Sequence, residues 1–289
     1  MYRVLFFSDL HLASFDEDFI RALRMIDDGL TWDADHIVFG GDTVDACQFE
    51  VFEELVRQLK IRKWFSADKM TIVPGNHDIY PISSRSIPKI STPNENFATF
   101  LKIVAPCCEG KNSHKLLSTS SYLFGKILAP GIVLAALDST REDHYNPNQW
   151  TAGEIQQQHM EKVTEFFGKH KKCLHRILVV HHYPWYEGNS EWKLFFPSDI
   201  VEPPPTLLRQ WMEDSLATYV LCGHIHDIKT KQLSRNCRAL RMGVSGEMNE
   251  YKSKNGERIR AYYVLDFLDN GRVNLIPREF TDSQLDRLF

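Results

Sequence analysis

Short apolar runs alternate with amphipathic stretches along the chain, and this alternation constrains the fold more than any other feature of the sequence. The apolar runs of strand length before Gly223 are residues 4–7, 37–39, 70–73, 132–137, 177–180 and 219–221. Two intervening stretches, residues 18–30 and 49–61, repeat apolar side chains at helical spacing. Continuous apolar strands separated by helices are typical of sheets that are buried on both faces. The pattern therefore predicts a layered α/β fold.

The chain after Gly223 has a different pattern, in which strand-like runs follow one another. We expect strands over residues 228–233, 237–242, 261–267 and 272–276, joined by turns. Earlier in the chain, the run from Thr151 to Glu154 fits a capping box that opens a helix to about Phe167. The stretches 78–93 and 185–205 contain several prolines and are predicted to be long loops.

Composition narrows the class of protein. The 289 residues are 43% hydrophobic, which is enough for one large core, and we expect a single domain over residues 1–289. The 34 basic and 38 acidic side chains give a formal net charge of -4, which disfavours a nucleic-acid partner. No apolar run has the length of a membrane span, so no membrane association is expected. The six cysteines form no CxxC pair, which favours a reducing, cytoplasmic setting.

Side chains that commonly bind metals follow nearly every predicted strand. They are Asp9 and His11; Asp42; Asn76, His77 and Asp78; His181 and His182; and His224 and His226. Ligands of open α/β sheets bind outside the carboxyl ends of the strands, so these segments are expected to meet at one edge. Each segment alone has an ordinary explanation; Asp45, three residues after Asp42, is for example typical of a helix N-cap. Their recurrence at successive strand ends has no such explanation.

The types and spacing of these residues indicate a site for two metal ions. Asp9 and His11 are two residues apart in extended chain, so both point to one side, and His224 and His226 repeat that spacing. A mixed set of imidazole, carboxylate and amide ligands suits manganese, iron, zinc or nickel better than calcium, which prefers oxygen ligands. The candidates exceed the needs of one ion, whereas two ions bridged by one carboxylate use them all.

The ordered motifs resemble those of the calcineurin-like metallophosphoesterase superfamily. They are Asp9-x-His11, Gly41-Asp42, Gly75-Asn76-His77-Asp78, a histidine after the strand at 177–180, and Gly223-His224-Ile225-His226. The motifs span residues 9 to 226 and occur in the family's order. The resemblance implies a four-layer αββα sandwich, with two mixed β-sheets flanked by helices and a two-metal site in the loops between the sheets.

The resemblance also implies a role for each matched residue. The first ion is expected on Asp9, His11, Asp42 and His226, and the second on Asp42, Asn76, His182 and His224, with Asp42 as the bridge. His182 is preferred to His181 because the family's ligand commonly stands two residues before a proline, here Pro184. His77 matches the histidine that approaches the substrate phosphate without binding metal. Asp78 is expected to hold the His77 imidazole.

The expected function is metal-dependent hydrolysis of a phosphodiester or phosphomonoester on a small substrate, by attack of a hydroxide that bridges the two ions. Class III cyclic-nucleotide phosphodiesterases are the nearest broad match. Asp45 stands where purple acid phosphatases carry a metal-binding tyrosine, so no such ligand is expected. The alternatives are a DNA or RNA nuclease of the same superfamily and a non-catalytic metal-binding scaffold. Trp185 and Tyr186, just after the fourth motif, are predicted to form a wall of the substrate pocket.

Overall fold

The computed structural model describes residues 1–82, 91–117, 121–140, 150–184, 200–243, 245–246, 252–253 and 255–288. The helices in these ranges are α1 (Glu17–Leu30), α2 (Phe49–Ile61), α3 (Asn76–Ile79), α4 (Pro93–Cys108), α5 (Gln157–Lys169), α6 (Pro205–Asp214) and α7 (Asp282–Leu285). The strands up to residue 154 are β1 (Tyr2–Phe7), β2 (His36–Phe39), β3 (Met70–Ile72), β4 (Ser113–Lys115), β5 (Leu123–Ala129), β6 (Ile132–Leu137) and β7 (Gly153–Glu154). The later strands are β8 (His175–Val179), β9 (Ile200–Glu202), β10 (Tyr219–Cys222), β11 (Ile228–Gln232), β12 (Arg238–Met242), β13 (Ile259–Phe267) and β14 (Val273–Thr281).

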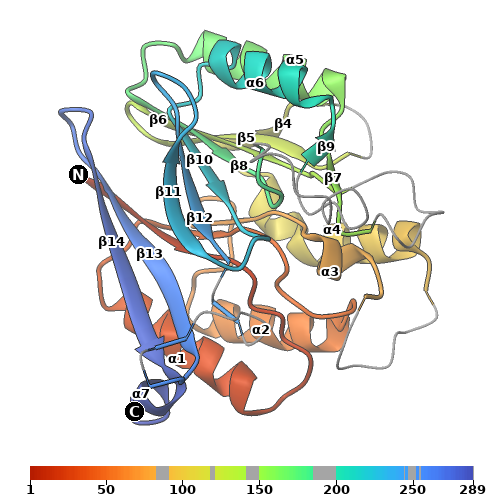
Figure 1. The fold of residues 1–289 in the computed structure, drawn as a ribbon, viewed down its shortest axis with the longest axis vertical. Helices are drawn as coiled ribbons and strands as arrows, with labels where there is room; N and C mark the ends of the chain where they lie inside the picture. Colours follow the sequence, from red (N-terminus) through yellow and green to blue (C-terminus); the bar gives the residue numbers. More distant parts are fainter. Residues whose placement is uncertain are drawn as a thin grey trace.

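Two large mixed sheets pack face to face between layers of helices (Figure 1). The five-stranded sheet has the order β14-β13-β1-β2-β3, and the seven-stranded sheet has the order β11-β12-β10-β8-β6-β5-β4. Helices α1 and α2 cover the outer face of the first sheet, and α5 and α6 cover the outer face of the second. The predicted four-layer αββα sandwich with two mixed sheets is confirmed.

Alternation along the strands divides the buried side chains of the second sheet between two cores. On β10, Leu221 belongs to the core between the sheets, whereas Val220 and Cys222 pack toward α5 and α6. Successive side chains of a strand point to opposite faces, so a strand covered on both faces must be apolar throughout. This double burial explains why the strands appear in the sequence as continuous apolar runs.

The parallel strands set the position of the candidate site. Strands β1, β2 and β3 run parallel in the first sheet, and β6, β8, β10 and β12 run parallel in the second. The carboxyl ends of β1 and β2 are in register, with Phe7 beside Phe39. The polar motifs begin directly after these strand ends, so the topology brings them to one edge of the sandwich, as predicted.

Two regions differ from the predictions. The capping box at Thr151–Glu154 is wrong, because Gly153 and Glu154 form β7, which pairs with β9, and α5 begins at Gln157. A capping box is found instead at α4, where the Thr92 side chain accepts from the Glu95 amide and Pro93 occupies the first turn, and another at α7. Pro93 was expected to end a loop, whereas it begins a helix. Pairing between distant segments overrode the local pattern at residue 153.

Helix α6 and strand β5 were not predicted, and β9 lies inside the stretch expected to be a loop. Residues 185–199, which include Trp185 and Tyr186, lie outside the described residues, so the prediction that these two side chains line a pocket stays a prediction. Among the described residues, no helix is both long enough and apolar enough to cross a membrane.

Candidate metal centre

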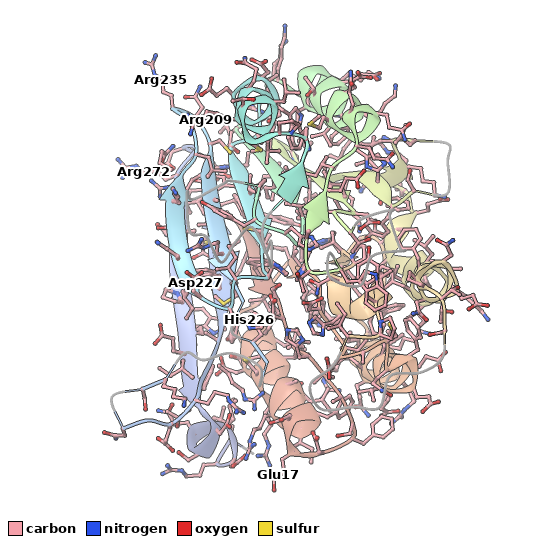
Figure 2. All side chains as sticks on the ribbon, turned by 45° about the vertical axis from the view of Figure 1, so that its right-hand side comes forward. Glu17, Arg209, His226, Asp227, Arg235 and Arg272 are labelled. Carbon is pink, nitrogen blue, oxygen red and sulfur yellow. The ribbon has the colours of Figure 1, made fainter. Side chains whose placement is uncertain are left out.

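Five segments bring polar side chains together between the two sheets. Asp9 and His11 follow β1, Asp42 follows β2, Asn76 and His77 begin α3, His181 and His182 follow β8, and His224 and His226 follow β10. The predicted convergence is therefore found. Most of these side chains are buried, whereas His226, labelled in Figure 2, has 27% of its side chain exposed. A buried group of imidazoles and carboxylates is stable only if charges and hydrogen bonds are matched inside it.

The backbone at this edge is unusual. The φ angles of the candidate ligands Asp9, His11, Asp42, His224 and His226 lie between 46° and 70°, in the left-handed region. Such a conformation costs about 1–3 kcal/mol for a residue other than glycine and persists only where surrounding contacts impose it. Here the amides of Asp9 and His11 donate to the carbonyls of Gly41 and Asp42. Clustering of this strain is typical of functional sites.

Three side chains form a first group of possible ligands. The Nε2 atoms of His11 and His226 are 3.2 Å apart, and His226 Nε2 lies 3.4 Å from Asp9 Oδ1. His11 Nε2 is also 3.7 Å from Asp42 Oδ2. Ligand atoms of Asp9, His11 and His226 lie within 4.8 Å of one another, as the ligands of one cation must.

A second group is centred on His181. Its Nε2 lies 3.2 Å from both Asp42 Oδ2 and Asn76 Oδ1, and 3.3 Å from His224 Nδ1. Its Nδ1 is 2.8 Å from the Gly40 carbonyl, which can accept only from a protonated nitrogen. That bond leaves Nε2 facing two acceptor oxygens, an arrangement that needs either a proton on Nε2 or a cation in its place. The donor set therefore fits a metal ion once that proton is lost.

Gly41 makes room for the second group. Its φ is +97°, and a Cβ atom at this position would lie 2.5 Å from His181 Nδ1. Both the backbone conformation and the lack of space require glycine here. The Gly-Asp motif is therefore needed for packing against His181 as well as for the turn.

His182 occupies a different environment. Ser139 Oγ lies 2.8 Å from its Nδ1 and accepts from its backbone amide at 3.1 Å. Its Nε2 is buried and has no hydrogen-bond partner in the described residues. One of its ring nitrogens lies within 4.8 Å of ligand atoms of His181 and His224. The sequence preference for His182 was based on its spacing to Pro184. The contacts favour His181, because that side chain reaches Asp42 and Asn76.

The contact predicted between Asp78 and His77 is wrong. His77 Nδ1 lies 2.9 Å from Asp45 Oδ1, whereas the Asp78 carboxylate accepts from the amides of Val44 and Gly75. Asp78 therefore fixes the loops after β2 and β3, and Asp45 orients the imidazole. The signal for Asp45 was its position three residues after Asp42, which we read as a helix cap. The N-cap of α2 is instead Gln48, which makes no side-chain capping bond.

Burial and charge act against each other in the site. Burial lowers the pKa of His11 to about 3 and holds the pKa values of His182 and His224 well below the ordinary value, so these imidazoles are neutral. Burial also acts to lower the pKa of His181, but the nearby Asp42 carboxylate raises it to about 9. In the metal-free protein a proton on His181 thus balances Asp42. Metal ligands must be deprotonated, so a bound cation replaces this proton.

His77 and Asp42 follow the same logic. Burial opposes protonation of His77, but the charge of Asp42 and the bond to Asp45 raise its pKa above the ordinary value. Burial alone would raise the pKa of Asp42, yet the charges of His181 and His77 hold it well below its usual range. The Asp42 carboxylate is therefore ionised, as a ligand shared between two cations must be.

Several solved structures share this fold at low sequence identity. A dimetal phosphatase from Danio rerio has a TM-score of 0.63 and 12% identity, with 97% of this chain and 98% of that one covered. A purple acid phosphatase from yellow lupin seeds has a TM-score of 0.60 and 11% identity, covering 98% of this chain and 52% of that one. The protein described as the anchor in the inner membrane complex of Plasmodium has a TM-score of 0.51 and 9% identity, covering 98% and 85%.

A search of the curated proteins found no sequence match. The family model of the calcineurin-like phosphoesterases, in contrast, matches residues 2–227, from β1 to the residue after His226. The match includes every candidate ligand, the three loops in which candidate ligands have left-handed φ angles, and the His77–Asp45 pair. The chain therefore belongs to the calcineurin-like phosphoesterase family.

Proposed function

We propose that the protein hydrolyses a phosphodiester of a small substrate with the help of two metal ions. One observation carries the proposal: His181 Nε2, with its other nitrogen bonded to the Gly40 carbonyl, faces the acceptor oxygens of Asp42 and Asn76. A cation bound between His181 Nε2 and the oxygens of Asp42 and Asn76 would give each of these atoms a partner. Membership in the phosphoesterase family supports the same chemistry.

The two groups of side chains divide naturally between two ions. Asp9, His11 and His226 would hold the first, and Asn76, His181 and His224 the second, with Asp42 in contact with both groups. The imidazole, carboxylate and amide ligands suit manganese, iron, zinc or nickel. Two such cations polarise a phosphoryl oxygen and make water acidic enough to act as a nucleophile near neutral pH.

His77 would act on the substrate and not on the metals. Asp45 holds its Nδ1, and its ring stands edge-on to that of His11 with 4.6 Å between the ring centroids. The residue is 9% exposed, whereas His11 beside it is 2% exposed. An imidazole oriented by a carboxylate on one nitrogen can hold a proton on the other and give it to a leaving oxygen.

The preference for diesters and the cytoplasmic setting remain parts of the proposal. The formal net charge of -4 is better suited to a small substrate held by metals than to a nucleic acid held by basic side chains. The six cysteines are free thiols, which is compatible with a reducing compartment. Trp185 and Tyr186 are proposed as pocket residues from their place in the sequence alone.

The test is hydrolysis of bis(p-nitrophenyl) phosphate and p-nitrophenyl phosphate by protein reconstituted separately with manganese, iron, zinc and nickel. We expect turnover that depends on added metal, is lost with a chelator, and is faster with the diester. Faster monoester turnover would correct the substrate class. Two bound ions without turnover of either substrate, or of single-stranded DNA, would overturn the enzymatic proposal in favour of a scaffold.

A further inference from the structure

Arg241 is a buried cation behind the candidate metal centre that the proposed chemistry does not use. It lies on β12 and is 3% exposed. Its side chain lies on the same face of the strand as that of Ala239, which packs in the core beneath α5 and α6. A buried guanidinium is costly to desolvate and is retained only where specific partners compensate for the loss of water.

Two partners of Arg241 lie in loops that carry candidate ligands. Its Nη2 lies 2.5 Å from Asp227 Oδ2, and its guanidinium stacks on the Tyr183 ring, 4.7 Å from the centroid. Asp227 directly follows His226, and Tyr183 directly follows His182. Figure 2 shows Asp227 and His226 side by side at the end of the strands. One side chain therefore touches the loop after β8 and the loop after β10.

The end of β12 supports the second of these loops through its backbone as well. The Gly243 amide donates to the Asp227 carbonyl at 3.2 Å, and a Cβ atom on Gly243 would lie 2.5 Å from the His226 amide nitrogen. Arg241 is in register with Cys222, the last residue of β10. The residue that follows β12 therefore holds the end of the loop that bears His224 and His226.

We propose that Arg241 is a positioning residue that sets the distance between these two loops, and with it the spacing of the two metal positions. The inference rests on the proposed function. The ion pair fixes the loop of His224 and His226, which supplies a ligand to each group, and the stacked ring fixes the loop of His181, which belongs to the second group alone. A planar guanidinium can do both at once, because its edge bonds a carboxylate while its face stacks on an aromatic ring.

The experiment is titration of Mn²⁺ into metal-free protein by calorimetry, at a temperature well below unfolding. The variant Arg241→Met should weaken both ions together, on the order of 10-fold each, the lower end of the usual cost of losing a partner behind a metal ligand. Arg241→Lys should recover only part of the loss, because an ammonium keeps the charge but not the stacking geometry. The matched control is Arg238→Met, an exposed arginine on the same strand, which should bind Mn²⁺ like the native protein.

Asp227→Asn provides a second variant that keeps the buried arginine and its stacking. It should weaken Mn²⁺ binding in the same direction as Arg241→Met, and the double variant should lose less than the sum of the two. A lower melting temperature with unchanged Mn²⁺ affinity in both variants would overturn the positioning role. Weakening of only one ion would overturn it too. Native protein that binds no Mn²⁺ would overturn the proposed function and this inference together.

Discussion

Two regions of this protein bury polar groups, and they differ in whether those groups satisfy one another. Lys126 on β5 is 2% exposed, and its ammonium donates to the carbonyls of Ala67, Met70 and Cys107 at 3.1, 2.5 and 2.6 Å. An ammonium has three hydrogens, so this group is complete. At the metal centre, in contrast, His181 Nε2 faces the oxygens of Asp42 and Asn76. Burial of polar groups alone does not indicate chemistry; the difference is that His181 Nε2 needs either a proton or a cation to match these acceptor oxygens.

The backbone shows the same difference. Ala67, Met70, Cys107 and Lys126 all have negative φ, whereas the candidate metal centre has five ligand residues in the left-handed region. Lys126 ties β5 to the segment before β3 and to the end of α4. Lys126 therefore connects elements of the fold, whereas the strained backbone of the candidate metal centre is typical of a functional site.

The largest effect is expected from Asp42→Ala. Asp42 contacts both ligand groups, so its removal should abolish metal-dependent hydrolysis and lower the content of both ions. Metal analysis by mass spectrometry and the diester assay measure the two effects on one preparation. Asp269→Ala, which removes an exposed carboxylate, is the control. Full metal content in Asp42→Ala would show that Asp42 is not needed to bind the ions, and the contrast with the Lys126 site would be lost.

The next largest effect is expected to distinguish His181 from its neighbour His182. His181→Ala should lose the second ion and most of the activity, because His181 reaches Asp42 and Asn76. His182→Ala should retain both ions, because the described contacts of its ring reach Ser139 and neither Asp42 nor Asn76. Mn²⁺ stoichiometry of the two variants decides between them. The reverse result, with the second ion lost only in His182→Ala, would restore the assignment made from the spacing to Pro184.

His77→Ala should keep both ions and lose roughly 10²–10⁴-fold in turnover, the usual range for a missing proton donor. Asp45→Asn should reduce turnover by a smaller factor, because the imidazole remains but is less firmly oriented. Rates are compared on the diester at saturating Mn²⁺, with metal content measured in parallel. Loss of an ion in His77→Ala would show that His77 is a ligand.

The smallest effect on activity is expected at Lys126. Lys126→Met should leave Mn²⁺ content and turnover unchanged and alter only stability. Burial lowers the pKa of Lys126 to about 8, below the value of about 10.4 in an unfolded chain. Between these pH values only the unfolded chain holds the proton, so the stability of the native protein relative to Lys126→Met should rise with pH, by at most about 3 kcal/mol. Urea unfolding from pH 7 to 10.5 measures this, and a flat difference would contradict it.

Local pattern was sufficient for much of the architecture. The helix over residues 49–61 was predicted with its observed bounds. The predicted strands all occur with ends shifted by at most two residues, except that β14 continues to Thr281 where an end at residue 276 was predicted. Strands buried on both faces must be apolar, so their signal is local. The candidate ligands were visible for a related reason, because each follows a strand and the parallel topology brings strand ends together. The single domain and the pocket role of Trp185 and Tyr186 stay predictions.

Tertiary structure decided which neighbouring residue takes each role. Asp45 and Asp78 are both carboxylates beside motif residues, and only the fold places Asp45 against His77 and leaves Asp78 to the amides of Val44 and Gly75. The fold likewise places His181 against the Gly40 carbonyl, which is 141 residues away in the chain, and His182 against Ser139, while the choice of ligand between them stays a prediction. The sequence by itself determined the chemistry available at the edge of the sheets, because residue types and strand ends are local properties. The pairing of those groups depends on contacts between distant segments, which no local pattern contains.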